Sequence, residues 1–188
     1  MRREELFKNK YRIKSIRLPY WDYGADGAYF ITVCVKDREC VFGEIKNGEM
    51  ILSQIGEIVQ KYWYEIPHHF GNAQLDGFVV MPNHVHGIVI ICNAAHRRDV
   101  ACNVSTACNV STTENMMSRI SPKSNSLSAI IRSFKSAVTK KCNEHKLFFQ
   151  WQPRYYEHVI RNEEELNSIR KYIMNNPLKW DFDKNQWN

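Results

Sequence analysis

The sequence lacks the cysteine spacings that mark structural zinc sites. Its six cysteines include no C-x-x-C pair, in which two residues separate the cysteines, and no zinc-ribbon spacing. No apolar run approaches the roughly 18 to 20 residues that a membrane helix needs. The N-terminal segment MRREELFKNKYRIK has no apolar stretch after its charges, as a secretory signal would. These absences argue against a zinc ribbon and predict a cytoplasmic protein without a membrane span.

Positive charge is distributed unevenly along the chain. The 188 residues carry a net charge of +6, and the length suits a single domain over 1–188. The segments 1–20 and 117–147 each hold seven Lys or Arg, against two acidic residues and one. Such concentrations of positive charge indicate a polyanionic partner, although a solvated charged surface explains them equally well.

Apolar periodicity predicts a mixed chain of strands and helices. The expected elements are a strand at 29–36, a hairpin at 42–52 around Asn47-Gly48, a helix at 53–66 ended by Pro67, strands at 74–81 and 84–92 joined by Pro82-Asn83, a helix at 126–142, a partly extended segment at 148–160 and a helix from Asn162 to Pro177. With the hairpin set aside, the order is βαββαβ plus a C-terminal helix. It predicts a ferredoxin-like α+β sandwich with an antiparallel sheet, a fold that hosts many functions.

A tandem repeat interrupts the regular pattern between the predicted strands and the second helix. The hexapeptide ACNVST stands at 101–106 and again at 107–112. Two copies of six residues are too few to build a solenoid. The stretch 93–124 is therefore predicted to be a mobile surface loop that has been expanded.

The segment MPNHVHG at 81–87 contains the most informative residues of the chain. Side chains alternate across a strand, so His84 and His86 are expected on the same face, where two imidazoles can share a metal ion. The chain has seven histidines, and a His-x-His pair in it can also arise by chance and be merely exposed or hydrogen-bonded.

The predicted C-terminal helix places Tyr172 and Asn176 one above the other, because residues four apart share a helix face. An amide oxygen of Asn176 can serve as a third metal ligand while the phenol points at a metal-bound substrate. A helical tyrosine is more often a core or rim residue, and the chain has nine tyrosines.

Taken together, three segments resemble a known family. MPNHVHG, the basic helix SLSAIIRSFKSAVTKKCN and the tail WQPRYYEHVIRNEEELNSIRKYIMNNPLKW are similar to the single-tyrosine HUH transposases, above all the REP-associated tyrosine transposases, named for repetitive extragenic palindromes. The likeness covers about 18–180. Two departures are the ACNVST repeat, where the family's linker is compact, and the variant N-terminal stretch RLPYWDYGADGAYF.

The resemblance implies roles for four residues. His84, His86 and Asn176 would hold Mg²⁺ or Mn²⁺, and Tyr172 would be the nucleophile. The family cuts single-stranded DNA beside hairpins or palindromic, REP-like elements, forms a 5′-phosphotyrosine link and releases a 3′-OH, which makes it an endonuclease and strand transferase. Its members work as monomers or homodimers. The ligand types alone would also suit zinc, nickel or copper.

This chemistry suits the residue types. A divalent ion stabilises the charge that builds on phosphate oxygens during cleavage, and a tyrosyl phosphodiester keeps the broken bond available for rejoining. Recognition is assigned to the basic helix, with Arg132, Lys135, Lys140 and Lys141 as phosphate contacts. Exposed aromatics are expected to stack unpaired bases, the candidates being Trp21, Tyr155 and Tyr156.

Two other functions stay open at this point. A non-catalytic module that binds single-stranded nucleic acid would use the same basic face and needs neither a metal nor Tyr172. A small-molecule metallohydrolase also uses His-x-His on a strand, but such barrels are usually longer and need metal-binding carboxylates that the sequence does not cluster.

Overall fold

The computed structural model describes residues 21–92 and 123–184. Its elements are β1 (Gly27–Cys34), the 3-10 helix η2 (Lys36–Arg38), β2 (Gly43–Lys46), β3 (Glu49–Leu52), α1 (Gln54–Tyr64), α2 (Ile66–His69), β4 (Ala73–Met81), β5 (His84–Ile91), α3 (Leu127–Glu144), β6 (Tyr156–Ile160) and α4 (Glu163–Lys184). The predicted loop at 93–124, with both ACNVST copies, lies outside the described residues except for its last two. The basic segment 1–20 lies outside them as well.

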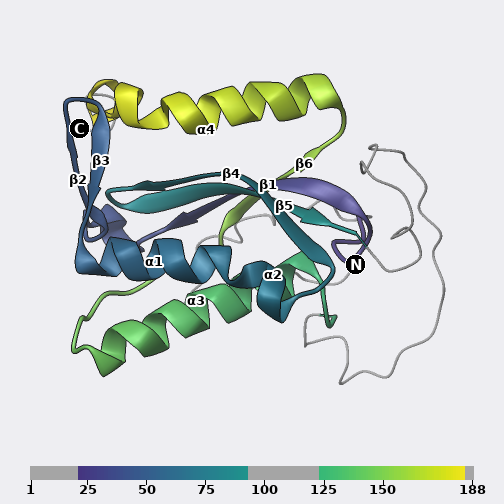
Figure 1. Cartoon of the computed structure of the whole chain (residues 1–188), viewed down its shortest axis with the longest axis horizontal. Coiled ribbons are helices and arrows are strands. Elements are labelled where there is room, and N and C mark those ends of the chain that lie inside the picture. Colours follow the sequence, from purple (N-terminus) through teal and green to yellow (C-terminus); the bar gives the residue numbers. More distant parts are fainter. Residues whose placement is uncertain (1–20, 93–122, 185–188) are drawn as a thin grey trace, which may run out of the picture.

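Four of the strands form one antiparallel sheet in the order β4-β5-β1-β6. Helices α1 and α3 cover one face of this sheet, and of the described helices α4 is the one that crosses the other face (Figure 1). Strands β2 and β3 form a separate hairpin. The α+β class and the antiparallel sheet are confirmed, and without the hairpin the main elements follow one another as βαββαβ and a final helix.

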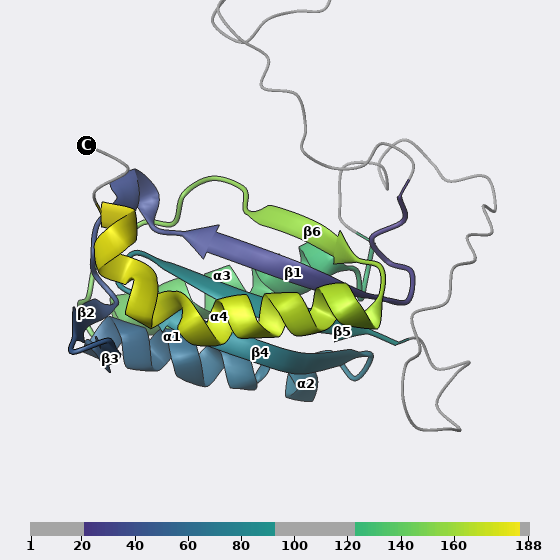
Figure 2. The ribbon, with the colours of Figure 1, turned by 90° about the horizontal axis from the view of Figure 1, so that it is seen from above.

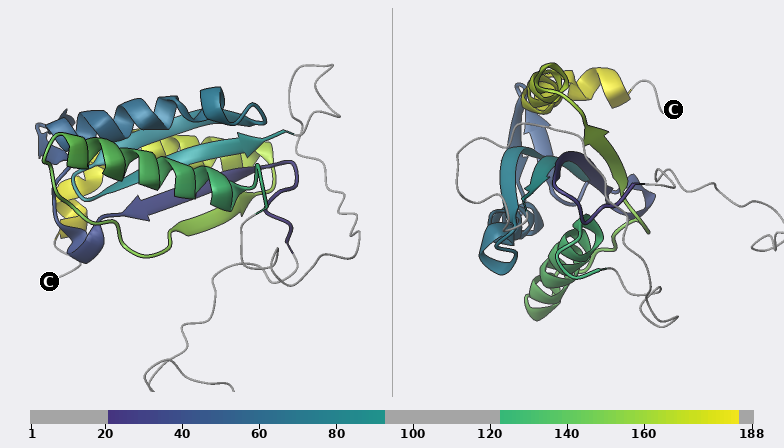
Figure 3. Two further views of the ribbon diagram at one scale, coloured as in Figure 1. Left: turned by 90° about the horizontal axis from the view of Figure 1, so that it is seen from below. Right: turned by 90° about the vertical axis from the view of Figure 1, so that its right-hand side faces the viewer.

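Each face of the sheet has its own apolar core, because side chains alternate along a strand. The larger core lies between the sheet and the pair α1 and α3, which run side by side (Figure 3). The smaller core lies beneath α4 and consists of Ala28, Phe30, Ile88, Ile160, Leu166 and Ile173. The face under α4 therefore holds less apolar packing, and its remaining area is available to polar side chains.

Local signals explain most element boundaries. Asn47 and Gly48 adopt φ values of 54° and 78°, as a two-residue hairpin turn between β2 and β3 requires. Ser53 and Ser126 cap α1 and α3, since each side-chain oxygen accepts a hydrogen bond from the backbone N–H three residues later. Across residues 21–92 and 123–184, every helix is too short or too polar to span a bilayer.

The prediction that Pro177 ends the last helix is wrong. Helix α4 continues through this proline to Lys184. Proline has no N–H to donate to the carbonyl of Ile173 and crowds that turn, so it kinks a helix or ends it. Here the last turns leave the line of the preceding ones (Figure 2). They also bury Trp180, which is 7% exposed, and this burial favours continuing the helix.

The packing of Trp63 on β5 yields a test of the fold. A Cβ atom at Gly87 would lie 2.2 Å from Cζ2 of Trp63, a fully buried ring stacked on Phe78. We expect Gly87→Ala to lower the free energy of unfolding by about 1–3 kcal/mol or more, because the fully buried Trp63 ring would have to shift within a packed core. Chemical unfolding followed by tryptophan fluorescence would measure the change.

The matched control is Gly77→Ala on the neighbouring strand β4. There the added Cβ would meet Cδ1 of Ile173 at 3.4 Å, an ordinary contact. The expected change is less than about 1 kcal/mol. Equal effects of the two substitutions would show that Trp63 does not pack on Gly87 as described.

Candidate active site

The two histidines of MPNHVHG lie together on the face of β5 that α4 covers. Their Nε2 atoms are 3.0 Å apart, and their ring centroids are separated by 4.5 Å. His86 is buried, with 6% of its surface exposed, and its ring stacks on Phe30. The strand geometry thus places both imidazoles as the sequence predicts, with their Nε2 atoms directed at each other.

Burial keeps both rings neutral. Desolvation, followed by the positive charge of Arg38, lowers the pKa of His84 from 6.5 to about 4. Desolvation, followed by the neighbouring His84, lowers the pKa of His86 to about 3. A neutral imidazole has a lone pair available to a metal ion, whereas an imidazolium has none. At neutral pH neither ring therefore has to release a proton to become a metal ligand.

Tyr172 reaches this pair from α4. Its Oη atom lies 3.4 Å from Nε2 of His86, and the two rings meet edge to face at a centroid distance of 5.3 Å. The edge of Phe30 also packs against the Tyr172 ring, with the centroids 6.0 Å apart. Because 45% of the Tyr172 surface stays exposed, the phenol is open both to solvent and to the histidines.

Asn176 and Trp180 continue the helix face that Tyr172 begins, since the three positions are spaced four residues apart. Trp180 packs near His84, with ring centroids 6.1 Å apart, as Tyr172 packs near His86. Asn176 lies one turn from each of them on this face and is only 2% exposed. A buried amide therefore lies on the same helix face as the two rings that contact the imidazoles.

The donor set fits a single divalent cation. Two imidazoles direct their Nε2 atoms at each other across 3.0 Å, and imidazole nitrogen is a common ligand of divalent metals. Within the described part of the chain, His, Cys, Asp and Glu side chains form no group of three or more that could hold an ion. An ion here would therefore depend on the imidazoles and on an amide such as Asn176.

An ion pair fastens α4 to the sheet close to Tyr172. The guanidinium of Arg170 donates to both carboxylate oxygens of Asp76, with Nε 2.9 Å from Oδ1. Asp76 lies where the pairing of β4 with β5 shifts register, between Leu75 and Phe78. Sequence reasoning missed this contact. The signal available was Asp-Gly inside an apolar strand, which is unfavourable in a regular strand and indicates a bulge.

The predicted phosphate-binding residues do not join this site. Arg132, Lys135, Lys140 and Lys141 lie on α3, across the sheet from α4 (Figure 1). The Lys135 ammonium already donates to the backbone oxygens of Gln152 and Arg154, and burial lowers its pKa. The Lys141 ammonium pairs with Glu144 at 3.1 Å.

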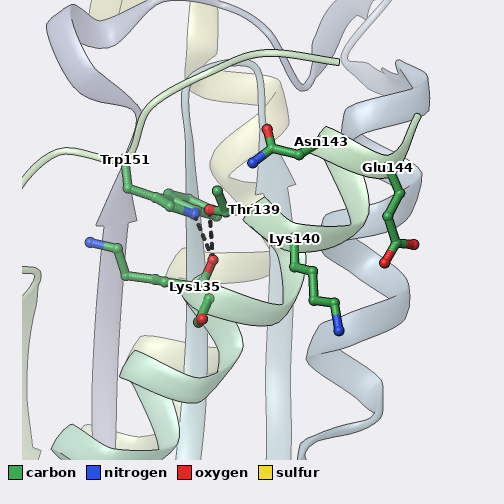
Figure 4. Close-up of a pocket in the computed structure, with 7 residues that line it drawn as sticks. Lys135, Thr139, Lys140, Asn143, Glu144 and Trp151 are labelled. Atoms are coloured by element: carbon green, nitrogen blue, oxygen red, sulfur yellow. Dashed lines mark hydrogen bonds between the residues drawn. The ribbon is translucent and has the colours of Figure 1, made fainter. Parts of the chain in front are cut away.

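Lys135 and Lys140 line an open depression on α3, where Trp151 packs against the helix (Figure 4). The backbone oxygen of Lys135 accepts hydrogen bonds from Nε1 of Trp151 and from the hydroxyl of Thr139. Trp151 is thus held in place by the helix. Contacts from this surface to DNA stay a prediction.

The three candidate stacking aromatics differ in exposure. Trp21 and Tyr155 are partly buried against the larger core, and Nε1 of Trp21 donates to the hydroxyl of Tyr29. Tyr156, in contrast, is 44% exposed on β6 and packs edge to face with Phe30 at 6.4 Å. Only Tyr156 of the three has an exposed ring beside the Tyr172 site.

Comparison with known proteins adds a sequence relative. No protein-family model matches the sequence. A Haemophilus influenzae protein, described only as an uncharacterized protein, is 37% identical over 172 residues, which are 91% of each chain. The chain belongs to the same family as this protein.

A solved structure has a fold similar to that of this chain. A REP-associated tyrosine transposase bound to a REP hairpin superposes with a TM-score of 0.54 and 20% sequence identity, over 87% of this chain and 74% of that one. The fold expected from the resemblance to REP-associated tyrosine transposases is thereby confirmed.

The ion pair between Arg170 and Asp76 predicts a pH-dependent contribution to stability. The hydrogen bond from Arg170 lowers the Asp76 pKa below its ordinary 3.8. A depressed carboxyl pKa stabilises the fold above the unfolded-state pKa, and this stabilisation is lost as the pH falls through the folded-state pKa. Asp76→Asn should therefore lower the free energy of unfolding by about 1 kcal/mol at pH 7.

The difference between the two proteins should shrink as the pH falls below the ordinary carboxyl pKa of 3.8 and through the lower folded-state pKa, which urea titrations at several pH values would measure. Glu44→Gln is the control, because Glu44 pairs with Lys46 on the exposed hairpin. A difference that stays constant across this pH range would show that the ion pair does not fasten α4.

Proposed function

We propose that the protein is a metal-dependent enzyme that nicks and rejoins single-stranded DNA, with Tyr172 as its nucleophile and His84, His86 and Asn176 as its metal ligands. The observation that carries the proposal is the position of the Tyr172 Oη, 3.4 Å from Nε2 of His86, whose own Nε2 faces that of His84. The fold shared with a REP-associated tyrosine transposase supports it.

The proposed reaction is a transfer of the DNA backbone to Tyr172. The phenolic oxygen attacks phosphorus, an O–P bond forms, and the bond from phosphorus to the 3′ oxygen breaks. The phenolic proton leaves to solvent, and the 3′ oxygen takes up a proton and departs as a 3′-OH. A divalent ion, when bound, stabilises the charge on the phosphate oxygens. Attack by a 3′-OH on the 5′-phosphotyrosine restores a phosphodiester.

The environment of His86 favours the role of ligand over that of base. A general base works best with a pKa near the working pH, and burial lowers the pKa of His86 to about 3. The exposed fraction of Tyr172 gives its proton a route to water instead. Both roles follow from the depth at which each side chain lies.

The substrate class follows from where charge and aromatic surface lie. Arg38 lies close enough to His84 to lower its pKa, and we assign it a contact to the cleaved phosphate, a role that the sequence did not indicate. Tyr156 offers an exposed ring for an unpaired base. Arg132, Lys140 and Lys141, on the far face, would contact the backbone of a hairpin or REP-like palindrome outside the cleaved strand.

One chain holds both Tyr172 and the two histidines. Their contact within a single chain supports a tyrosine that acts in cis, and hence a monomer that is complete in itself. The alternative is a homodimer in which the helices are exchanged between protomers. A small-molecule metallohydrolase barrel receives no support, because the sheet is open and has β4 and β6 at its edges.

Metal binding tests the ligand assignment. We expect the protein to bind one Mn²⁺, measured by calorimetry or by the electron paramagnetic resonance signal of free Mn²⁺, and Mg²⁺ more weakly. His84→Ala and His86→Ala should each reduce the Mn²⁺ affinity by more than the roughly 10- to 100-fold typical of changing a residue that only orients a ligand. His158→Ala is the control: it removes a histidine of β6 that pairs with Glu165 of α4, and it should leave binding intact. Binding that survives loss of both His84 and His86 would refute the ligand assignment.

The covalent intermediate tests the assignment of the nucleophile. Incubation with Mn²⁺ and a labelled single-stranded oligonucleotide that carries a hairpin should yield a denaturation-resistant protein–DNA adduct. Tyr172→Phe should abolish the adduct, because no other group in this position offers an attacking phenol. Tyr156→Phe is the matched control: it alters an exposed tyrosine beside the same Phe30 ring and should retain the adduct.

The outcomes separate the competing functions. An adduct that persists in Tyr172→Phe means that the nucleophile is wrongly assigned. Metal-independent binding of single-stranded DNA, without any adduct, would indicate the non-catalytic binding module instead. Adduct formation in a mixture of the His84→Ala and Tyr172→Phe proteins would show that the tyrosine acts in trans and that the dimer is the active form.

A further inference from the structure

The turn between β4 and β5 contains Asn83, whose side-chain amide contacts Nδ1 of His84. Asn83 spans two partners: its Nδ2 donates to the backbone oxygen of Arg38 at 3.1 Å, and its Oδ1 lies 2.6 Å from Nδ1 of His84. The carbonyl of Arg38 is presented by an unusual turn, in which Asp37 and Arg38 have left-handed φ values of 54° and 56°. Non-glycine residues rarely adopt such values, and they persist where the surrounding structure holds them.

These contacts determine which way the Asn83 amide faces. A backbone carbonyl only accepts hydrogen bonds, so the atom of Asn83 that faces Arg38 must be the NH₂ group. The amide oxygen then faces His84. Because that oxygen also only accepts, Nδ1 of His84 has to carry the proton. A neutral ring with its proton on Nδ1 has its lone pair on Nε2, the atom that faces His86.

His86 has a partner of a different kind. Its Nδ1 lies 2.8 Å from the hydroxyl of Thr32 on β1, the cross-strand neighbour of His86. A hydroxyl both donates and accepts, so Thr32 is compatible with either tautomer of His86. Two lone pairs facing each other at 3.0 Å would repel, so without an ion His86 donates its Nε2 proton to His84. If Nε2 of His86 were to bind an ion, its proton would have to be on Nδ1, which faces Thr32.

We propose that Asn83 and Thr32 are positioning residues of the metal site: Asn83 holds His84 permanently in the Nδ1–H form, and Thr32 allows His86 to exchange tautomers when an ion binds. The proposal rests on the metal site assigned above. Hydrogen bonds to the second ring nitrogen commonly orient metal-binding histidines and raise their basicity. Here the two partners differ. The amide oxygen of Asn83 only accepts and keeps His84 in one tautomer, whereas the hydroxyl of Thr32 can donate or accept and permits both tautomers of His86.

The test reads the tautomers directly. In protein labelled with ¹⁵N-histidine, at neutral pH and free of metal, long-range proton–nitrogen spectra distinguish protonated from unprotonated ring nitrogens. We expect His84 as the Nδ1–H form and His86 as the Nε2–H form. Addition of Zn²⁺, a diamagnetic probe, should leave the His84 proton in place and move that of His86 to Nδ1.

Variants of Asn83 separate positioning from packing. Asn83→Leu has a similar volume but no acceptor, so we expect His84 to become a mixture of tautomers and the Mn²⁺ affinity to fall roughly 10- to 100-fold. Asn83→Asp retains an acceptor and should keep His84 in the Nδ1–H form. Thr32→Val should weaken Mn²⁺ binding as well, whereas Thr32→Ser should preserve it.

Two results would overturn the proposal. One is His84 in the Nε2–H form in the unaltered protein, a result that does not depend on the folding of any variant. The other is an unchanged His84 tautomer in folded Asn83→Leu. Because the spectra of the metal-free protein involve no DNA, either result leaves the role of Tyr172 untouched. Conversely, an adduct in Tyr172→Phe would refute the proposed nucleophile and leave the tautomer assignment standing.

Discussion

The packing of α4 across one face of the sheet is the constraint on which the candidate site depends. A small apolar cluster, centred on Ile88 and Ile173, anchors the helix along the sheet. The bidentate contact from Arg170 to Asp76 adds a directional restraint two residues before Tyr172. Apolar burial alone lets a helix slide or rotate, whereas a guanidinium that grips both carboxylate oxygens sets its angle. Together these contacts place the phenol beside the imidazoles.

The same packing sets the electrostatics of the histidines. The rings of Phe30 and Trp180 pack against the imidazoles and, with α4 above them, exclude much of the surrounding water. Loss of hydration disfavours the charged form of an imidazole. It therefore lowers the pKa of both histidines below the ordinary value of 6.5. Each neutral imidazole has one ring nitrogen with a free lone pair, which the proposed metal site requires.

Pro177 shows how the end of α4 serves this arrangement. A proline within a helix removes one backbone hydrogen bond and bends the axis, so it costs stability at that turn. The segment after the bend buries Trp180 against the sheet side of the molecule, next to His84. Asn176, just before the proline, is almost fully buried on the same face. The bend thus lies between Asn176, the proposed amide ligand, and Trp180, whose ring packs near His84.

The sequence by itself determined the features that depend on local signals: the alternation that puts His84 and His86 on one face, the Asn47-Gly48 turn and the apolar stripes of the long helices. It also paired Tyr172 with Asn176, because four-residue spacing is a property of any α-helix. Only the tertiary structure decided which face of the sheet α4 covers, since an apolar stripe does not specify its partner. The contact of Asp76 with Arg170 and the continuation of α4 through Pro177 were likewise decided by long-range packing. So was the separation of the basic helix α3 from the site, because the distance between two helices packed on opposite faces of a sheet leaves no trace in the periodicity of either.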